Sequence, residues 1–184
     1  INRITIGTLI LSDIADKAVY NELLSYSDVY ENVIFMSRNQ SLSFDDMLFT
    51  CLNPVKNSGG LDGANDYSLV FKMTYKEFDM LFTGDISERI EKELVNISDC
   101  DVLKVAHHGS KNPSSEEFLN IVSPKIAVIS AGQRNTYGHP HLETIERLKE
   151  CGAGILCTKD TGAIIISTDG HETRVGVKKR QSLF

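Results

Sequence analysis

Two short apolar segments, each ending in residues that bind metal ions, constrain the fold of this sequence most. The first runs through Leu81–Phe82 into Thr83-Gly84-Asp85, and the second runs through Val102–Val105 into His107-His108. About one helix separates them, so we expect two strands of an α/β protein that end in a carboxylate and two imidazoles. His139 lies in a third loop of the same kind. Carboxylate oxygens and imidazole nitrogens bind divalent ions, so the sequence predicts one edge of a hydrolytic metal site.

Length and composition indicate one globular domain. The chain has 184 residues, of which 41% are hydrophobic and 24% are charged, as in ordinary soluble proteins. We expect a single domain over residues 1–177 and a basic tail over residues 178–184. No apolar run approaches the roughly 20 residues that a membrane-spanning helix needs. The net charge of −6 argues against a broad basic face for nucleic acid, although a bound divalent ion would add local positive charge.

Periodicity and turn residues predict a strand-rich, mixed pattern with three or four helices. Asp13 is expected to cap a helix that ends near Ser25, and Ser87 to cap one that ends near Val95. Lys76-Glu77 and Asp169-Gly170 are expected to join hairpin strands. The long loop 53–66 is of the kind that is often functional. The predicted strands cover residues 4–11, 32–36, 47–52, 68–75, 78–82, 101–105, 125–130, 155–157, 163–167 and 172–177, and two further helices are expected from Pro113 and over 142–151.

The residues alone leave the roles of Asp85 and of the pair His107-His108 open. Asp85 could bridge metal ions, with Gly84 allowing the bend, or it could cap the next helix. Neighbouring residues on a strand point to opposite sides, so only one of His107 and His108 is expected to face an ion. The other would contact substrate or support the ligands. Gly109 and Ser110 are expected to offer backbone N–H groups to an anion just before a helix.

The remaining histidines and the cysteines have weaker contexts. His139 could be a metal ligand, a proton donor or a phosphate contact. We assign His141 to a helix start and His171 to a hairpin turn, without a chemical role. The four cysteines lack C-x-x-C spacing, so a zinc ribbon is not expected, and Cys51 and Cys157 are predicted to be small buried side chains.

Nucleophilic hydrolysis is the rival chemistry. Ser110 lies close in sequence to His107 and His108 and could imitate a Ser-His pair. The chain has no G-x-S-x-G elbow, no Walker A loop and no dinucleotide-binding fingerprint, so the metal-dependent alternative is preferred.

Taken in order, these segments resemble the metallo-β-lactamase superfamily, and in particular the soluble domain of ComEC-type competence proteins, the DNA-internalisation channel proteins of bacteria. Single motifs such as T-G-D are weak, but the ordered set from about Ile4 to Gly170 is specific. The segments that carry the resemblance are Asn65–Val70, Leu81–Asp85, Val102–Lys111, Ser114–Leu119, Pro124–Ser130, Tyr137–Pro140 and Asp160–Ala163.

The resemblance implies an αββα sandwich with a metal site at one edge of two sheets. Members of the superfamily usually hold two divalent ions, zinc or manganese, which activate a bridging water. By resemblance, Asp85 is the bridging carboxylate and His108 or His107 is a later ligand. Asn65 stands where many members have a histidine. Ser110, Lys111 and His139 are implied as groups that contact the substrate or support the ligands, and Asp85, His108 and His139 as the catalytic set.

One departure from the family pattern is large. The H-x-H-x-D-H cluster that supplies most ligands of the metal pair is absent from this sequence. In competence-type domains it precedes the strand that matches Ile4–Leu11. We therefore expect this chain to be a piece of a longer protein, lacking the first strands of the domain. We also expect weak or no metal binding and no catalysis by residues 1–184 alone, and an exposed sheet edge that favours dimerisation.

Three functions follow from the resemblance. The leading one is a metal-dependent nuclease that cuts DNA during uptake, attached to a membrane channel at the outer face of the cytoplasmic membrane. The second is another phosphodiesterase or esterase on the same fold, similar to phosphorylcholine esterases; the absence of Trp counts against a choline-binding aromatic cage. The third is a non-catalytic docking module of the membrane DNA channel.

Overall fold

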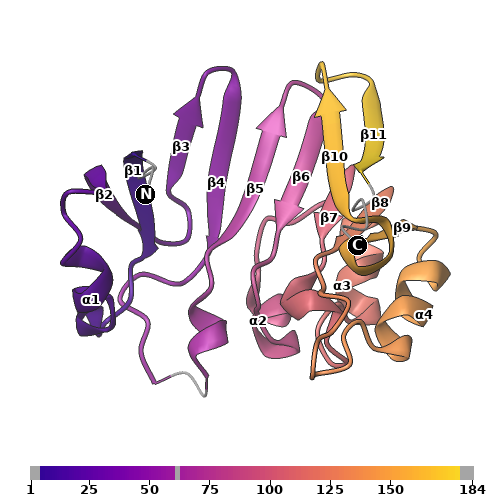
Figure 1. Ribbon diagram of the computed structural model, residues 1–184, viewed down its shortest axis with the longest axis horizontal. Coiled ribbons are helices and arrows are strands. Elements are labelled where there is room, and N and C mark those ends of the chain that lie inside the picture. Colours follow the sequence, from indigo (N-terminus) through magenta and orange to yellow (C-terminus); the bar gives the residue numbers. More distant parts are fainter. Residues whose placement is uncertain (1–4, 61–62, 179–184) are drawn as a thin grey trace, which may run out of the picture.

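A seven-stranded mixed sheet forms the centre of the molecule (Figure 1). The computed structural model describes residues 5–60 and 63–178. Strands β3 to β6 run antiparallel to their neighbours, whereas β6 to β9 run parallel. In sheet order these strands are β3 (Ser41–Phe44), β4 (Met47–Asn53), β5 (Val70–Tyr75), β6 (Phe78–Phe82), β7 (Val102–Lys104), β8 (Ile126–Ile129) and β9 (Gly154–Cys157).

Two small sheets and short helices complete the described chain. Strands β1 (Ile6–Ser12) and β2 (Tyr30–Met36) pair in parallel, and β10 (Ala163–Thr168) and β11 (Thr173–Lys178) form an antiparallel hairpin. The α-helices are α1 (Asn21–Leu24), α2 (Glu88–Glu93), α3 (Glu116–Val122), α4 (Leu142–Glu150) and α5 (Thr158–Thr161). Single 3-10 turns are η1 (Lys17–Tyr20), η2 (Ala64–Tyr67) and η3 (Ala106–Gly109).

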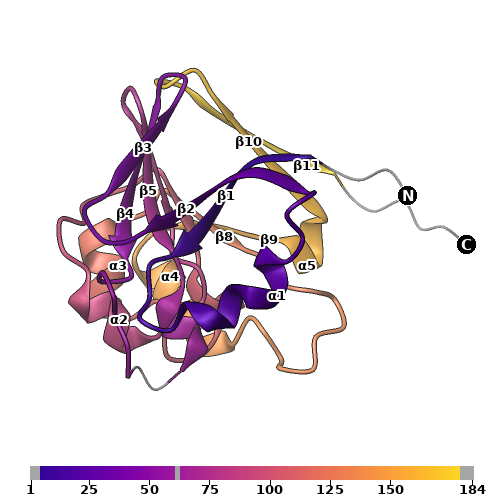
Figure 2. The same ribbon diagram turned by 90° about the vertical axis from the view of Figure 1, so that its left-hand side faces the viewer.

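Helices α2, α3 and α4 cover one face of the large sheet, and the small sheets lie toward its other face (Figure 2). Leu81 and Leu103 of the sheet belong to the same buried cluster as Ile90, Phe118 and Leu148 of the helices. Each of these side chains is at most 2% exposed, so their burial removes most of their apolar surface from water. This packing fixes the carboxyl ends of β6, β7 and β8 at one edge of the sheet.

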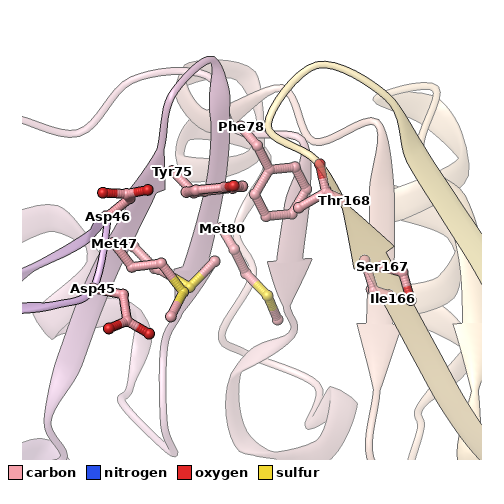
Figure 3. Close-up of a pocket in the computed structure, with 10 residues that line it drawn as sticks. Asp45, Asp46, Met47, Tyr75, Phe78, Met80, Ile166, Ser167 and Thr168 are labelled. Carbon is pink, nitrogen blue, oxygen red and sulfur yellow. The ribbon is translucent and has the colours of Figure 1, made fainter.

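The opposite face of β4, β5 and β6 borders a hollow of about 950 Å³ (Figure 3). Residues alternate across a strand, so the side chains that face this hollow are not those of the helix-covered core. Met47, Met73 and Met80 come from three neighbouring strands, and β10 stands on the far side with Ile166. The structure therefore has a β layer on each side of this hollow, and the predicted α/β class is confirmed.

Most predicted strands are found with small shifts at their ends, but the predicted capping residue and length of the first helix are wrong. Asp16, and not Asp13, caps the segment by accepting a hydrogen bond from the N–H of Ala18. Asp13 is buried and pairs with Lys17 at 2.8 Å. The 13–25 segment forms η1 and a single turn, α1, because the exposed side chains there give little packing energy to a longer helix. Strand β3 and helix α5 were not predicted.

The prediction that Cys51 and Cys157 are buried is confirmed, and the four cysteines are free. Within residues 5–60 and 63–178, no helix has the length and apolar character to span a bilayer. Ile4 of the first predicted strand and residues 179–184 of the predicted tail lie outside the described residues, and Lys178 is the last residue of β11.

Candidate functional site

Parallel strands bring the predicted polar residues to one edge of the sheet. Asp85 follows β6, His107 and His108 follow β7, and His139 follows β8, whose carboxyl ends lie side by side. Ligands of α/β sheets bind at this edge because the loops there converge. Strand β5 runs the other way, so its preceding turn, which carries Asn65, reaches the same edge.

The turn after β6 is fixed by close backbone packing. Gly84 has φ +57°, and a Cβ there would lie 2.6 Å from the Cβ of Ser68. Glycine is therefore needed for both the left-handed conformation and the space. The Ser68 hydroxyl accepts a hydrogen bond from the N–H of Asp85 at 3.1 Å. Asp85 does not cap α2, whose N-cap is Ser87, so the carboxylate is left to face the neighbouring strand end.

His107 and His108 lie in a turn and not on a strand. Their φ values of 46° and 57° are left-handed, which is unusual for residues with side chains. The N–H of His107 donates to the Gly84 carbonyl at 3.1 Å, which ties this turn to the end of β6. The prediction that the two rings point to opposite sides is wrong, because strand alternation ends with β7 at Lys104. Both rings lie near His139, at centroid distances of 5.7 and 6.4 Å.

His108 has the orientation of a metal ligand. Its Nδ1 lies 2.7 Å from the Ser130 carbonyl oxygen, and a carbonyl can only accept, so Nδ1 carries the proton. Its Nε2 then faces Asp85 Oδ2 at 3.4 Å. An unprotonated Nε2 and a carboxylate are both acceptors, so this pair needs either a proton on Nε2 or a cation between them. A backbone carbonyl that holds the far nitrogen is the usual support of a metal-bound histidine.

His107 has a weaker partner. Its Nε2 lies 3.5 Å from Nδ2 of Asn65, at the outer limit of a hydrogen bond. The amide is the donor in this pair, so the structure brings Asn65 to the cluster as a neighbour of His107. Asn65 and Asp85 also border a hollow of about 910 Å³ that extends to Tyr20.

His139 lies at the centre of an aromatic cluster and is 9% exposed. Burial lowers the pKa of its imidazole, and the neighbouring His141, His107 and His108 lower it further. Asn135 holds the loop by accepting from the N–H of His139 at 2.7 Å and donating to its carbonyl at 2.8 Å. The site therefore contains a histidine that is largely neutral at pH 7.

Sequence reasoning missed two members of this cluster. His141 lies at the start of α4, as predicted, but its ring also lies 5.0 Å from that of His139, and its N–H donates to the Gly109 carbonyl. Tyr137 stacks on His139 at 5.7 Å and is 77% exposed. The run Tyr-Gly-His-Pro-His was visible in the sequence, but only the tertiary contacts show that three of its rings meet.

Lys104 is a further residue that the sequence analysis did not select. It is the one charged residue of β7, and its Nζ donates to the Gly84 carbonyl at 3.1 Å and lies 3.8 Å from Asp85 Oδ1. Burial lowers the pKa of this ammonium, while the charge of Asp85 opposes the shift. A lysine within an apolar strand was the signal that could have identified it.

The expectation for Gly109 and Ser110 is wrong. The N–H of Ser110 donates to the His107 carbonyl at 2.9 Å, and α3 begins only at Glu116, so no helix N-terminus lies there. No hydrogen bond joins the Ser110 hydroxyl to a histidine in the described part of the chain. Lys111 pairs with Glu143 at 2.7 Å on the surface.

The donor set fits part of a metal centre. Asp85 and His108 are suited to two coordination positions of one divalent ion. In residues 5–60 and 63–178, no group of three His, Cys, Asp or Glu side chains is arranged to hold a metal ion. The described residues therefore do not by themselves fit the two-ion centre that the family resemblance implies.

Comparisons with known proteins agree with this architecture. Residues 22–133 match the metallo-beta-lactamase superfamily. ComE operon protein 3 of Bacillus subtilis is 32% identical over 167 residues, which cover 89% of this chain and 21% of that protein. Competence protein ComA of Neisseria gonorrhoeae is 35% identical over 130 residues, which cover 68% of this chain and 18% of that protein.

A third relative and one solved structure complete the comparison. Recombination protein 2 of Haemophilus influenzae is 33% identical over 121 residues, covering 65% of this chain and 15% of that protein. The chain thus spans about one fifth of the length of these curated relatives. A solved structure of a protein from Parabacteroides distasonis has the same fold, with a TM-score of 0.50 at 10% identity over 86% of this chain and 78% of that chain.

Proposed function

Because the chain belongs to the metallo-β-lactamase superfamily, we propose that it is the metal-dependent hydrolase domain of a ComEC-type competence protein, with DNA as its substrate. Its reaction would be cleavage of a phosphodiester during DNA uptake, for example in the strand that is not imported. The name of the relative from Neisseria gonorrhoeae, competence protein ComA, supports a role in competence.

The observation that carries this proposal is the pair formed by Asp85 and His108. The Ser130 carbonyl fixes the tautomer of His108, so its free nitrogen faces a carboxylate oxygen across 3.4 Å. In this proposal a divalent cation, and not a proton on Nε2, satisfies the two acceptors. Asp85 and His108 would hold the ion, which would supply an activated water and stabilise charge on a phosphoryl oxygen. Residues 5–60 and 63–178 hold no group of three such side chains that could bind a metal ion, so in this proposal the remaining ligands come from outside those residues.

The other residues of the site have supporting roles in this proposal. His139, as a neutral imidazole, contacts the phosphate that is cut. Asn65, which borders the same hollow as Asp85, and its neighbour His107 orient the substrate. Ser110 and Lys111 follow the histidine turn and contact the substrate from there, where the Lys111 ammonium can exchange Glu143 for a phosphate oxygen.

Tyr137 supports a nucleic-acid substrate. An exposed aromatic ring beside the site can stack on a base of single-stranded DNA, and such stacking does not depend on sequence. The net charge of −6 gives no broad basic surface, so backbone affinity would come mainly from the bound cation and from Lys111. A single exposed tyrosine does not form the aromatic cage that binds choline, which favours DNA over a phosphorylcholine ester.

We further propose that the domain is attached to the channel part of a longer membrane protein and lies at the outer face of the cytoplasmic membrane. The relatives are about five times as long as the matched region, which leaves room for such a part. The nuclease would then meet DNA before the strand enters the channel.

The decisive experiment compares residues 1–184 with a form extended at the N-terminus to include the preceding segment of the parent protein. Both are assayed on single-stranded DNA with added manganese or zinc, and bound metal is measured in parallel. We expect only the extended form to cut, and Asp85→Ala to abolish the cutting. Cleavage that survives Asp85→Ala would contradict the proposal.

The alternatives give different results. If the extended form binds two ions and leaves DNA intact, the esterase alternative gains support. If it binds no ions and does not cut, a docking module of the channel is the better explanation.

A further inference from the structure

The segment that follows the histidine turn, residues 110–115, is bound by a buried carboxylate. Glu91 of α2 is 3% exposed, and its two oxygens accept hydrogen bonds from the N–H groups of Ser114 at 2.5 Å and Ser115 at 3.1 Å. A buried carboxylate is unfavourable unless such donors satisfy it. Glu91 therefore joins α2 to the start of α3 through the main chain of this segment.

A guanidinium binds the main-chain carbonyls of the same segment. Arg147 of α4 donates through Nε and Nη2 to three main-chain carbonyls, and the planar fork of arginine suits such multiple contacts. The neighbouring hydroxyl of Thr144 donates to the Ser110 carbonyl at 2.7 Å. The three carbonyls bound by Arg147 are those of Lys111 at 2.6 Å, Pro113 at 3.0 Å and Ser114 at 2.8 Å.

The 110–115 segment directly follows the turn that carries His107 and His108, and it is hydrogen-bonded to that turn. The N–H of Ser110 donates to the His107 carbonyl, and the Gly109 carbonyl accepts from His141. A Cβ at Gly109, which has φ +79°, would lie 2.6 Å from the Cβ of Pro140. A displacement of the segment therefore moves the backbone that carries His108.

We propose that Glu91 and Arg147 are positioning residues, which hold the 110–115 segment between two helices and thereby keep His108 aligned with Asp85. This inference rests on the proposed function, since the aligned pair is the proposed metal site. Neither residue touches that pair. Their role is to restrain a turn whose left-handed histidines are strained and would otherwise relax.

The first test compares Glu91→Gln with Glu116→Gln, which makes the same chemical change on an exposed residue of α3. In Glu91→Gln one accepting oxygen is replaced by an NH₂ group, which is itself a donor and cannot accept a hydrogen bond from Ser114 or Ser115. We expect the amides of Ser114 and Ser115 to exchange hydrogen about tenfold faster or more. We also expect the proton signal of His108 Nδ1–H to shift or broaden, whereas Glu116→Gln should leave both measurements unchanged.

A titration separates positioning from general loss of structure. Burial raises the pKa of Glu91 to about 7, and the charge of Glu88 adds to the shift, whereas the hydrogen bonds from Ser114 and Ser115 oppose it; Lys92 is a neighbouring cation. The amide shifts of Ser114 and Ser115 should therefore titrate with a midpoint near pH 7 in the wild type. Glu91→Gln should remove this transition.

Arg147→Lys keeps the positive charge but replaces the planar guanidinium, with its several donors, by a single ammonium. It serves as the second variant if Glu91→Gln does not fold. It should loosen the segment and alter the His108 signal in the same direction. An unchanged His108 signal in a folded variant whose 110–115 amides exchange faster would overturn the proposal. Both readouts are taken without substrate or metal, so they remain decisive even if the extended protein cuts no DNA.

Discussion

At the scale of single residues, the two adjacent histidines are not equivalent. Ser130 fixes the ring of His108 at 2.7 Å, whereas His107 has only a marginal contact of 3.5 Å with Asn65. In the extended form, we expect His108→Ala to lower metal-dependent cleavage about 100-fold or more, since even loss of a supporting partner costs about 10- to 100-fold. His107→Ala should have a smaller effect. Cleavage rates and metal titrations of both variants test this order, and equal losses would contradict it.

Gly84 gives a second prediction at this scale. Alanine there requires a left-handed φ, which costs about 1–2 kcal/mol, and places a methyl group against Ser68. Gly84→Ala should therefore lower the free energy of unfolding by at least this amount in urea titrations. Gly132→Ala is the matched control, because nothing lies within 4 Å of its Cβ position, and it should stay within about 0.5 kcal/mol of the wild type.

At the scale of elements, the contact of α2 with α3 predicts a pH dependence of stability. The pKa of Glu91 is raised from 4.5 to about 7 by burial, so the folded state holds this proton to a higher pH than the unfolded state does. The stability that this group contributes is therefore present below about pH 4.5 and decreases as pH rises to 7. The loss is on the order of 3 kcal/mol.

Urea titrations at several pH values from 4.5 to 7 check this expectation. Glu91→Gln cannot ionise, so its unfolding free energy should fall less steeply over this window than that of the wild type. Parallel slopes for the two proteins would show that Glu91 titrates at its ordinary pKa.

The elements themselves were largely predictable where their pattern is local. The β5–β6 hairpin and the β10–β11 hairpin follow from apolar strands around Lys76-Glu77 and Asp169-Gly170. The prediction of a long helix after Asp13 was wrong because the side chains of that segment are not buried against the rest of the protein. The sequence alone does not show which segments the tertiary structure leaves exposed. Strand β3 was missed because its polar Ser-Leu-Ser-Phe sequence is stabilised by pairing with β4.

At the scale of the whole molecule, the two small sheets leave apolar residues exposed. Ile165 of β10 is 54% exposed, and Val175 and Val177 of β11 are 42% and 50% exposed. Exposed strand edges with apolar side chains promote association. We expect residues 1–184 to form dimers that depend on concentration in sedimentation experiments.

Val177→Lys should weaken this association, because the charge would have to be buried at the new interface. Val19→Lys is the control, since Val19 is equally apolar and 62% exposed but lies in η1, away from β11. A wild-type chain that stays monomeric at high concentration would contradict the prediction of an exposed, associating edge.

The α/β class, most of the strands and the positions of Asp85, His108 and His139 at strand ends could be predicted from the sequence, because each depends on local periodicity and turn residues. Long-range packing is needed to bring His107 and His108 to one side, to fix the ring of His108 with Ser130, and to add His141 and Tyr137 to the cluster. The same packing brings Glu91 and Arg147 to the 110–115 segment. These contacts join residues up to 36 positions apart, and such pairings are set by the packing of helices on the sheet and not by any local pattern.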